Sequence, residues 1–131
     1  MGDIGIVSYR IVIDAREINS STGRYVERLL TYLCAIDHTN HYFIIIHPKD
    51  EAYWTPTSKN FTLVTSAAQK FTLAEQLSLK REIESLEPDL VHFCMPQQPV
   101  LYSGKKVTTI HDLFQLSATN PTKNQFIYKL K

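Results

Sequence analysis

The stretch Tyr42-Phe43-Ile44-Ile45-Ile46-His47 decides the fold, because it is apolar up to its last residue and is stopped by Pro48. A strand with one face in solvent alternates apolar and polar residues, whereas a strand buried on both faces is a continuous apolar run. Burial on both faces is typical of a parallel sheet covered by helices. The stretch therefore predicts a strand of a parallel, helix-covered sheet.

Strands and helices alternate along the rest of the chain. The predicted strands are residues 11–13 (extended back through Ile6 and Val7), 42–47, 61–65, 90–93 and 106–110. One helix is predicted after residue 22 and another from residue 72. Such alternation predicts an α/β fold with a Rossmann-like, mostly parallel sheet and helices on both faces.

The two helices are recognised by different signals. The first has an apolar stripe at helical spacing and an N-cap at Ser21 or Thr22. Its stripe consists of Val26, Leu29, Leu30, Leu33 and Ile36. The second begins at a capping box, in which the side chains of Thr72 and Glu75 each accept a hydrogen bond from a free backbone N–H. Its predicted buried side consists of Leu73, Leu77, Ile83 and Leu86.

The bulk composition is that of an ordinary globular domain. The chain has 131 residues, of which 44% are hydrophobic and 21% charged, close to the usual averages for one domain. A net charge of +1 argues against nucleic-acid binding driven by bulk electrostatics. Cys34 and Cys94 are expected to be buried free thiols in a reducing, cytoplasmic environment. Residues 1–10 lack secretory-signal features, and no apolar run approaches the roughly 20 residues of a membrane span.

The ends of the sequence carry their own expectations. Residues 1–8 are expected to be an N-terminal extension or the start of the first strand, and residues 9–131 one domain. Asn120-Pro121 is expected to open a helix, with Pro121 at its first position. Because the sequence stops at Lys131, about where that helix would be in mid-course, we expect a domain that is incomplete at its C-terminus.

Two histidines stand at the ends of predicted strands. The run Thr109-Ile110-His111-Asp112-Leu113 leaves the last strand, and Asp89-Leu90-Val91-His92-Phe93 forms the one before it. Parallel α/β sheets bind ligands beyond the carboxyl ends of their strands, and imidazole titrates near neutral pH. In the functional interpretation His111 faces a ligand and Asp112 orients a neighbour or caps the loop. In the structural interpretation both bond local groups, and His92 points into the sheet.

Gly23 marks the entry to the first helix. Free backbone donors at a helix N-terminus favour anions such as phosphate, and a glycine lets a ligand approach the backbone closely. The alternative is that Gly23 only permits a tight turn. Arg24 is poorly placed for the helix dipole, so it either reaches a ligand or a carboxylate, or is a solvated side chain.

Several short runs together resemble a known family. They are Ile11-Val12-Ile13-Asp14-Ala15-Arg16, Thr22-Gly23-Arg24-Tyr25-Val26 with Leu29-Leu30, Asp89-Leu90-Val91-His92-Phe93 with Pro96 and Pro99, and Val107-Thr108-Thr109-Ile110-His111-Asp112-Leu113. Each run is short, but their order and spacing over residues 11–121 are specific. In this combination the chain resembles the N-terminal domain of GT-B fold glycosyltransferases of the family 4 type, the glycosyl transferases group 1.

The resemblance implies the acceptor-side half of a two-domain GT-B fold. In such enzymes the other half binds the nucleotide-sugar donor, and transfer retains the anomeric configuration without an obligatory metal or another cofactor. On this pattern His111 is catalytic and faces the transferred sugar, while Gly23 lies in the loop near the donor phosphates. Arg24, His92 and Asp112 are expected to bind substrate, the first two on the acceptor side.

The implied activity is mannosyltransferase-like hexosyl transfer from a nucleotide-sugar to a glycan or a lipid-linked acceptor. It places the protein in the cytoplasm or at the cytoplasmic membrane face. The sequence contains no donor-binding half, so we expect a further domain or a partner chain to supply it, self-association through exposed apolar surface, and no transfer by this chain alone. The alternative is a non-catalytic Rossmann-like binding or interaction module. We predict no metal site, because the spacing of His38, His41 and His47 is not that of metal ligands.

Overall fold

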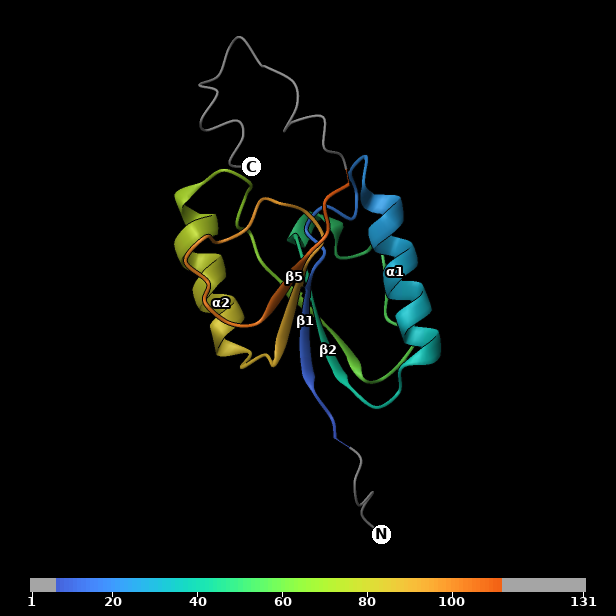
Figure 1. Ribbon diagram of the computed structural model, residues 1–131. Coiled ribbons are helices and arrows are strands. Elements are labelled where there is room, and N and C mark those ends of the chain that lie inside the picture. Colours follow the sequence, from blue (N-terminus) through green and yellow to red (C-terminus); the bar gives the residue numbers. More distant parts are fainter. Residues whose placement is uncertain (1–6, 112–131) are drawn as a thin grey trace.

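The structure, a computed structural model, describes residues 7–111. They form a parallel sheet between helices on its two faces (Figure 1), which confirms the predicted Rossmann-like α/β arrangement. The elements in chain order are β1 (Arg10–Asp14), α1 (Gly23–Ile36), β2 (His41–Ile46), the 3-10 turn η1 (Pro48–Asp50), β3 (Phe61–Thr65), the π-helical segment η2 (Glu75–Leu79), α2 (Lys80–Ser85), β4 (Leu90–Phe93) and β5 (Lys106–Thr108). No helix within this range is long and apolar enough to cross a membrane.

The strand order of the sheet is β3-β2-β1-β4-β5, and every neighbouring pair is parallel. Val12 of β1 lies opposite Phe43 of β2 and Val91 of β4, so β1 is the central strand. The chain builds outward from β1 to β3 and then crosses to β4 on the other side of β1. The connections that leave β1 and β4 therefore run in opposite directions, and sheets of this kind bind ligands at such a switch point.

The helix α1 covers one face of the sheet with the apolar stripe that the sequence predicts. Val26, Leu30 and Cys34 are buried in the cluster between α1 and the sheet. Ile36, which was predicted to belong to the stripe, is 75% exposed. The prediction is wrong there because, at about 100° per residue, Ile36 lies roughly 160° around the helix from Cys34.

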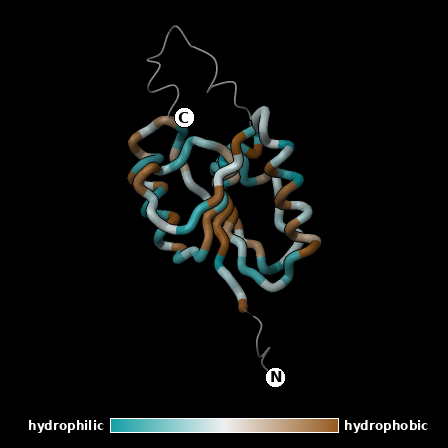
Figure 2. The backbone as a smooth tube through the Cα atoms, in the orientation of Figure 1, coloured by the Kyte–Doolittle hydropathy of each residue, from teal (hydrophilic) through white to brown (hydrophobic). Residues whose placement is uncertain are grey.

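The opposite face is covered by η2 and α2, and Figure 2 shows the most apolar backbone segments gathered in the strands between the two helical layers. Leu79 and Ile83 are buried against β1 and β4. Leu73 and Leu77, predicted to lie on the buried side, are instead 74% and 47% exposed. The π-helical turn takes in one residue more than an α-helical turn, so it shifts the buried position to Leu79.

Strand boundaries differ from the predictions at two ends. β1 begins at Arg10 rather than at Val7, because the pairing of Arg10 with His41 is the first parallel pair of this strand. β5 ends at Thr108, so residues 109–111 are a loop. Three predictions concern residues outside the described range, namely the strand start at Ile6, the role of Asp112 and the helix from Pro121.

Candidate functional site

The carboxyl ends of β1, β4 and β5 bring three loops together at the switch point of the sheet. These loops are residues 15–22, 94–97 and 109–111, which are far apart in the sequence. A pocket of about 290 Å³ lies among them. It is lined by Glu17, Ser20, Ser21, Thr22, Lys70, Met95, Pro96, Gln97 and His111. The structure therefore places His111 at the site where the fold predicts a ligand.

His111 is held by contacts with two other elements. Its Nε2 lies 2.6 Å from the carbonyl oxygen of Cys94, and its ring meets that of Tyr25 edge-on at a centroid distance of 4.8 Å. A carbonyl oxygen only accepts, so Nε2 carries a proton and donates it in this hydrogen bond. In the neutral imidazole Nδ1 is then the acceptor, and among the described residues it has no partner. His111 thus offers a lone pair at the pocket.

His92 is linked to His111 through two other side chains, those of Thr109 and Tyr25. Its Nε2 is 2.7 Å from the Thr109 hydroxyl, which lies 3.1 Å from the Tyr25 hydroxyl. Burial lowers the pKa of His92 below its usual 6.5, so this imidazole is neutral at neutral pH. The half-buried His92 supports Thr109 and Tyr25, which in turn border His111.

Thr109 and Tyr25 were not among the residues predicted to form the site. Tyr25 directly follows the Gly23-Arg24 pair and lies in the first turn of α1. Its position in the sequence, next to two predicted site residues, could therefore have predicted that it borders the site. The importance of Thr109 depends on the end of β5, which the sequence predicted two residues too late. As a strand residue Thr109 would alternate in direction with its neighbours, whereas in the loop it bonds both His92 and Tyr25.

Gly23 is explained by the packing of the protein itself. A Cβ atom at Gly23 would lie 1.8 Å from the carbonyl oxygen of Ile18, so only glycine allows this close approach. The N–H groups of Gly23 and Tyr25 donate to the carbonyls of Ser20 and Thr22. Thr22, one of the two residues predicted as the N-cap, occupies that position, but its hydroxyl makes no capping hydrogen bond. Much of the predicted anion-binding potential of this helix entry is thus already used.

Arg24 is not brought to the pocket. It is exposed on α1 and forms no ion pair with any residue between 7 and 111. Of the residues predicted to bind substrate, His92 is linked to His111 through Thr109 and Tyr25, and Gly23 closes the loop beside the pocket, whereas Arg24 is not among the residues that line the pocket. Its expected contact with an acceptor stays a prediction.

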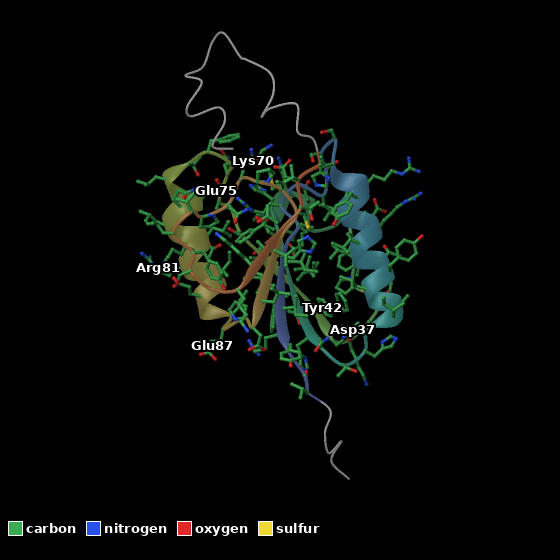
Figure 3. The ribbon with its side chains drawn as sticks, viewed as in Figure 1. Asp37, Tyr42, Lys70, Glu75, Arg81 and Glu87 are labelled. Atoms are coloured by element: carbon green, nitrogen blue, oxygen red, sulfur yellow. The ribbon has the colours of Figure 1, made fainter. Side chains whose placement is uncertain are left out.

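A buried ion triad that the sequence did not predict lies at the same edge of the sheet. Arg16 Nη2 is 2.8 Å from Asp14 Oδ2 and 2.9 Å from Glu75 Oε2, and all three residues are less than 10% exposed. Burial by itself would lower the pKa of Arg16, but the two carboxylates outweigh it and raise the pKa above the usual value. The guanidinium therefore stays charged and joins the end of β1 to the start of η2. Figure 3 shows Glu75 near Lys70 at this edge.

Glu75 was predicted to belong to a capping box, and this prediction is partly right. The N–H of Glu75 donates to the Thr72 hydroxyl over 3.2 Å, as a capping box requires. The carboxylate differs from the prediction, because Oε1 accepts from the N–H of Phe71 at 3.3 Å and Oε2 binds Arg16. One side chain thus fixes both the helix entry and the loop after β1.

The two cysteines are buried and free, as predicted. Burial, with a smaller contribution from the Asp14 carboxylate, raises the pKa of the Cys94 thiol to about 12. Such a thiol is protonated and unreactive at neutral pH. Within residues 7–111 no group of three or more His, Cys, Asp or Glu side chains is arranged to hold a metal ion.

The described residues thus form a Rossmann-like parallel sheet with a histidine, two hydroxyl groups and a pocket at its switch point. Comparisons of the chain with protein-family models, with curated proteins and with solved structures found no match.

Proposed function

We propose that this chain is the acceptor-side domain of a retaining glycosyltransferase, which moves a sugar from a nucleotide-sugar to a glycan or a lipid-linked acceptor. The observation that carries the proposal is the position of His111, which lines a pocket formed by loops that leave three parallel strands. The run that contains His111 is also the strongest point of the sequence resemblance. Position and resemblance therefore support the same residue.

In this proposal His111 contacts the sugar that is transferred. Its proton lies on Nε2 and is held by Cys94, so Nδ1 accepts a hydrogen bond from a sugar hydroxyl. Tyr25 restrains the ring from the side. A side chain that is held in place in this way helps to stabilise the transition state, because it need not reorient as the reaction proceeds.

The donor side of the reaction is assigned to a second domain or a partner chain. A leaving diphosphate needs preorganised hydrogen-bond donors, and the helix entry at Gly23 has few to offer. We therefore expect that the purified chain alone transfers no sugar. Detectable transfer from a nucleotide-sugar by this chain would contradict the assignment of the donor site to another domain.

The second candidate is a Rossmann-like binding or interaction module without catalytic activity. It is favoured by the environment of Gly23, where the backbone of Ile18 alone accounts for the glycine. It is also favoured by exposed apolar side chains near β5, such as Val107 and Ile110, which are 50% and 54% exposed. In that reading the site at His111 binds no sugar.

An NMR titration distinguishes the two candidates. The ¹⁵N-labelled chain is titrated with methyl mannoside, GDP-mannose and UDP-glucose, and amide shifts are followed. We expect shifts at residues 20–22, 94–97 and 109–111, lost in His111→Ala and retained in His41→Ala, a matched change of an exposed histidine at the other end of the sheet. No shift with any of the three probes, or equal shifts in both variants, would favour the interaction module.

A further inference from the structure

A second pocket lies beside the one that contains His111. Its volume is about 390 Å³, within the range of small-molecule sites, and it shares Glu17 and Lys70 with the first pocket. It is lined by Arg16, Glu17, His47, Lys49, Ala68, Gln69, Lys70 and Phe71. These residues come from the loops after β1, β2 and β3, so this pocket lies at the same edge of the sheet but on the side away from β4.

The charges around this pocket favour an anion. The triad of Arg16, Asp14 and Glu75 carries a net charge of −1, but its side chains are at most 3% exposed, so the charges that reach solvent in this pocket are those of Lys49, Lys70 and Glu17. Lys49 is exposed and forms no ion pair with any described residue. Lys70 lies 3.1 Å from Glu17, but its side chain is 42% exposed and keeps ammonium donors for a ligand. Two lysines thus face one carboxylate.

His47 adds a neutral donor to the two lysines. Its Nδ1 accepts the backbone N–H of Lys49 at 3.2 Å, so the proton of the neutral ring is on Nε2. The following turn η1 begins at Pro48 and fixes the chain between His47 and Lys49. The two side chains are thereby held on one short, defined turn rather than on a long loop.

Phe71 provides an apolar wall. It is 58% exposed and has a φ of 63°, a left-handed conformation that is unfavourable for a bulky side chain. The hydrogen bond from its N–H to Glu75 helps to hold this conformation. Strained backbone of this kind gathers at functional sites. A phenyl ring that lines the same pocket as two lysines suits a ligand that has both an anionic group and an apolar C–H face, as a phosphorylated sugar has.

We propose that this second pocket binds a phosphorylated sugar, with the phosphate at Lys49, Lys70 and His47 and the sugar ring against Phe71. The role of this pocket as an acceptor site rests on the proposed glycosyl transfer at His111. The binding of a sugar phosphate in the pocket is independent of that proposal. The phosphate comes from one of two sources, a soluble sugar phosphate or the headgroup of a lipid.

The test uses the ¹⁵N-labelled chain with four probes: inorganic phosphate, glucose 1-phosphate, glucose, and phosphatidylcholine vesicles with or without phosphatidylglycerol. We expect glucose 1-phosphate to shift the amides of residues 47–49 and 68–71 more strongly than phosphate or glucose alone. Binding of glucose 1-phosphate assigns a soluble source. Binding only to the phosphatidylglycerol vesicles, with loss in the lysine variants below, assigns the phosphate to a lipid headgroup and overturns the sugar contact at Phe71. Binding of neither overturns the proposal.

Matched variants distinguish binding in this pocket from non-specific electrostatic attraction to surface lysines. Lys49→Gln and Lys70→Gln are each expected to weaken binding by about fivefold, and Glu17→Gln to strengthen it by removing the one carboxylate that faces the ligand. Lys59→Gln makes the same charge change at an exposed lysine outside the pocket and is expected to leave binding unchanged. Equal losses in Lys59→Gln and Lys70→Gln would overturn the proposal. All three lysines are exposed, and the amide spectrum of each variant reports its folding.

The experiments can contradict either of the two proposals without contradicting the other. If glucose 1-phosphate shifts residues 47–49 and 68–71 while the three sugar probes leave residues 109–111 unmoved, the glycosyl-transfer proposal fails and the phosphate site stands. If methyl mannoside or a nucleotide-sugar shifts residues 109–111 while neither glucose 1-phosphate nor the phosphatidylglycerol vesicles bind, the phosphate site fails and glycosyl transfer stands.

Discussion

Arg16 Nη2 lies 2.9 Å from Glu75 Oε2, and this contact ties the loop after the central strand to the start of η2. Both residues help to shape the second pocket, because Arg16 lines it and Glu75 accepts the N–H of Phe71, another lining residue. The shape of this edge of the sheet therefore depends on a charge that is buried with its two partners. A buried charge is tolerated only while its partners remain.

Arg16→Met is expected to destabilise the protein strongly. It leaves Asp14 and Glu75 buried without a cation, and the loss of one member of a buried ionic group typically costs about 3–5 kcal/mol. Lys80→Met is the matched control, since Lys80 forms an exposed ion pair with Glu84 that should contribute about 0.5 kcal/mol or less. Urea unfolding at pH 7 measures the free energy of unfolding of both variants. Similar losses in the two would mean that the buried triad stabilises the protein no more than the exposed pair does.

Gly23→Ala distinguishes a packing role from a ligand role. The new Cβ would lie 1.8 Å from a backbone oxygen of Ile18, so the loop must move, at a cost of about 1–3 kcal/mol. Thermal unfolding without any ligand measures the cost. Ser21→Ala, at an exposed position of the same loop, is expected to change the melting temperature little. An unchanged melting temperature in Gly23→Ala would show that the close approach to Ile18 is not required.

The stability of the protein is expected to depend on His92 at mildly acidic pH. Burial lowers the pKa of His92 in the folded state below its usual 6.5. Below pH 6.5 the unfolded chain binds a proton that the folded chain does not, so the free energy of unfolding falls as the pH decreases. His92→Gln should weaken this dependence between pH 7.5 and 5.5, whereas exposed His41→Gln should retain it. A slope that His92→Gln leaves unaltered would contradict the neutral state of His92.

Asp37 at the end of α1 provides a second pH-dependent contribution, at the opposite end of the sheet (Figure 3). Burial would raise its pKa, but hydrogen bonds from Tyr42, Asn40 and Thr39 outweigh this and hold the pKa well below 3.8. The contribution is therefore complete above pH 3.8 and is lost as the pH falls further. Asp37→Asn should destabilise the protein at pH 7, and its difference from the wild type should shrink below pH 3.8 in urea titrations. A constant difference from pH 7 to pH 2 would be the contrary result.

Periodicity in the sequence predicted the layers of the fold, because burial leaves a local pattern. The apolar run around Ile44 identified a strand that is buried on both faces, and the stripe of α1 identified one of its covers. Leu77 was misplaced because a π-helical turn changes the phase of a helix without a clear signal in residue type. The partner of Glu75 was missed because Arg16 is 59 residues away in the sequence, and such contacts depend on the order of the strands.

Thr109→Val tests whether the side chains around His111 act as a unit. Valine keeps the shape of threonine but removes the hydroxyl that bonds both His92 and Tyr25. Without the hydrogen bond to Thr109, the Tyr25 ring should restrain His111 less. The imidazole ¹⁵N signals of both histidines should therefore shift. Any sugar affinity at residues 109–111 should also fall. Thr62→Val, the same change at an exposed position of β3, should leave these signals unmoved. If Thr109→Val alters the His92 signals and leaves those of His111 unchanged, the position of His111 is set by Cys94 alone, and Tyr25 has no part in holding it.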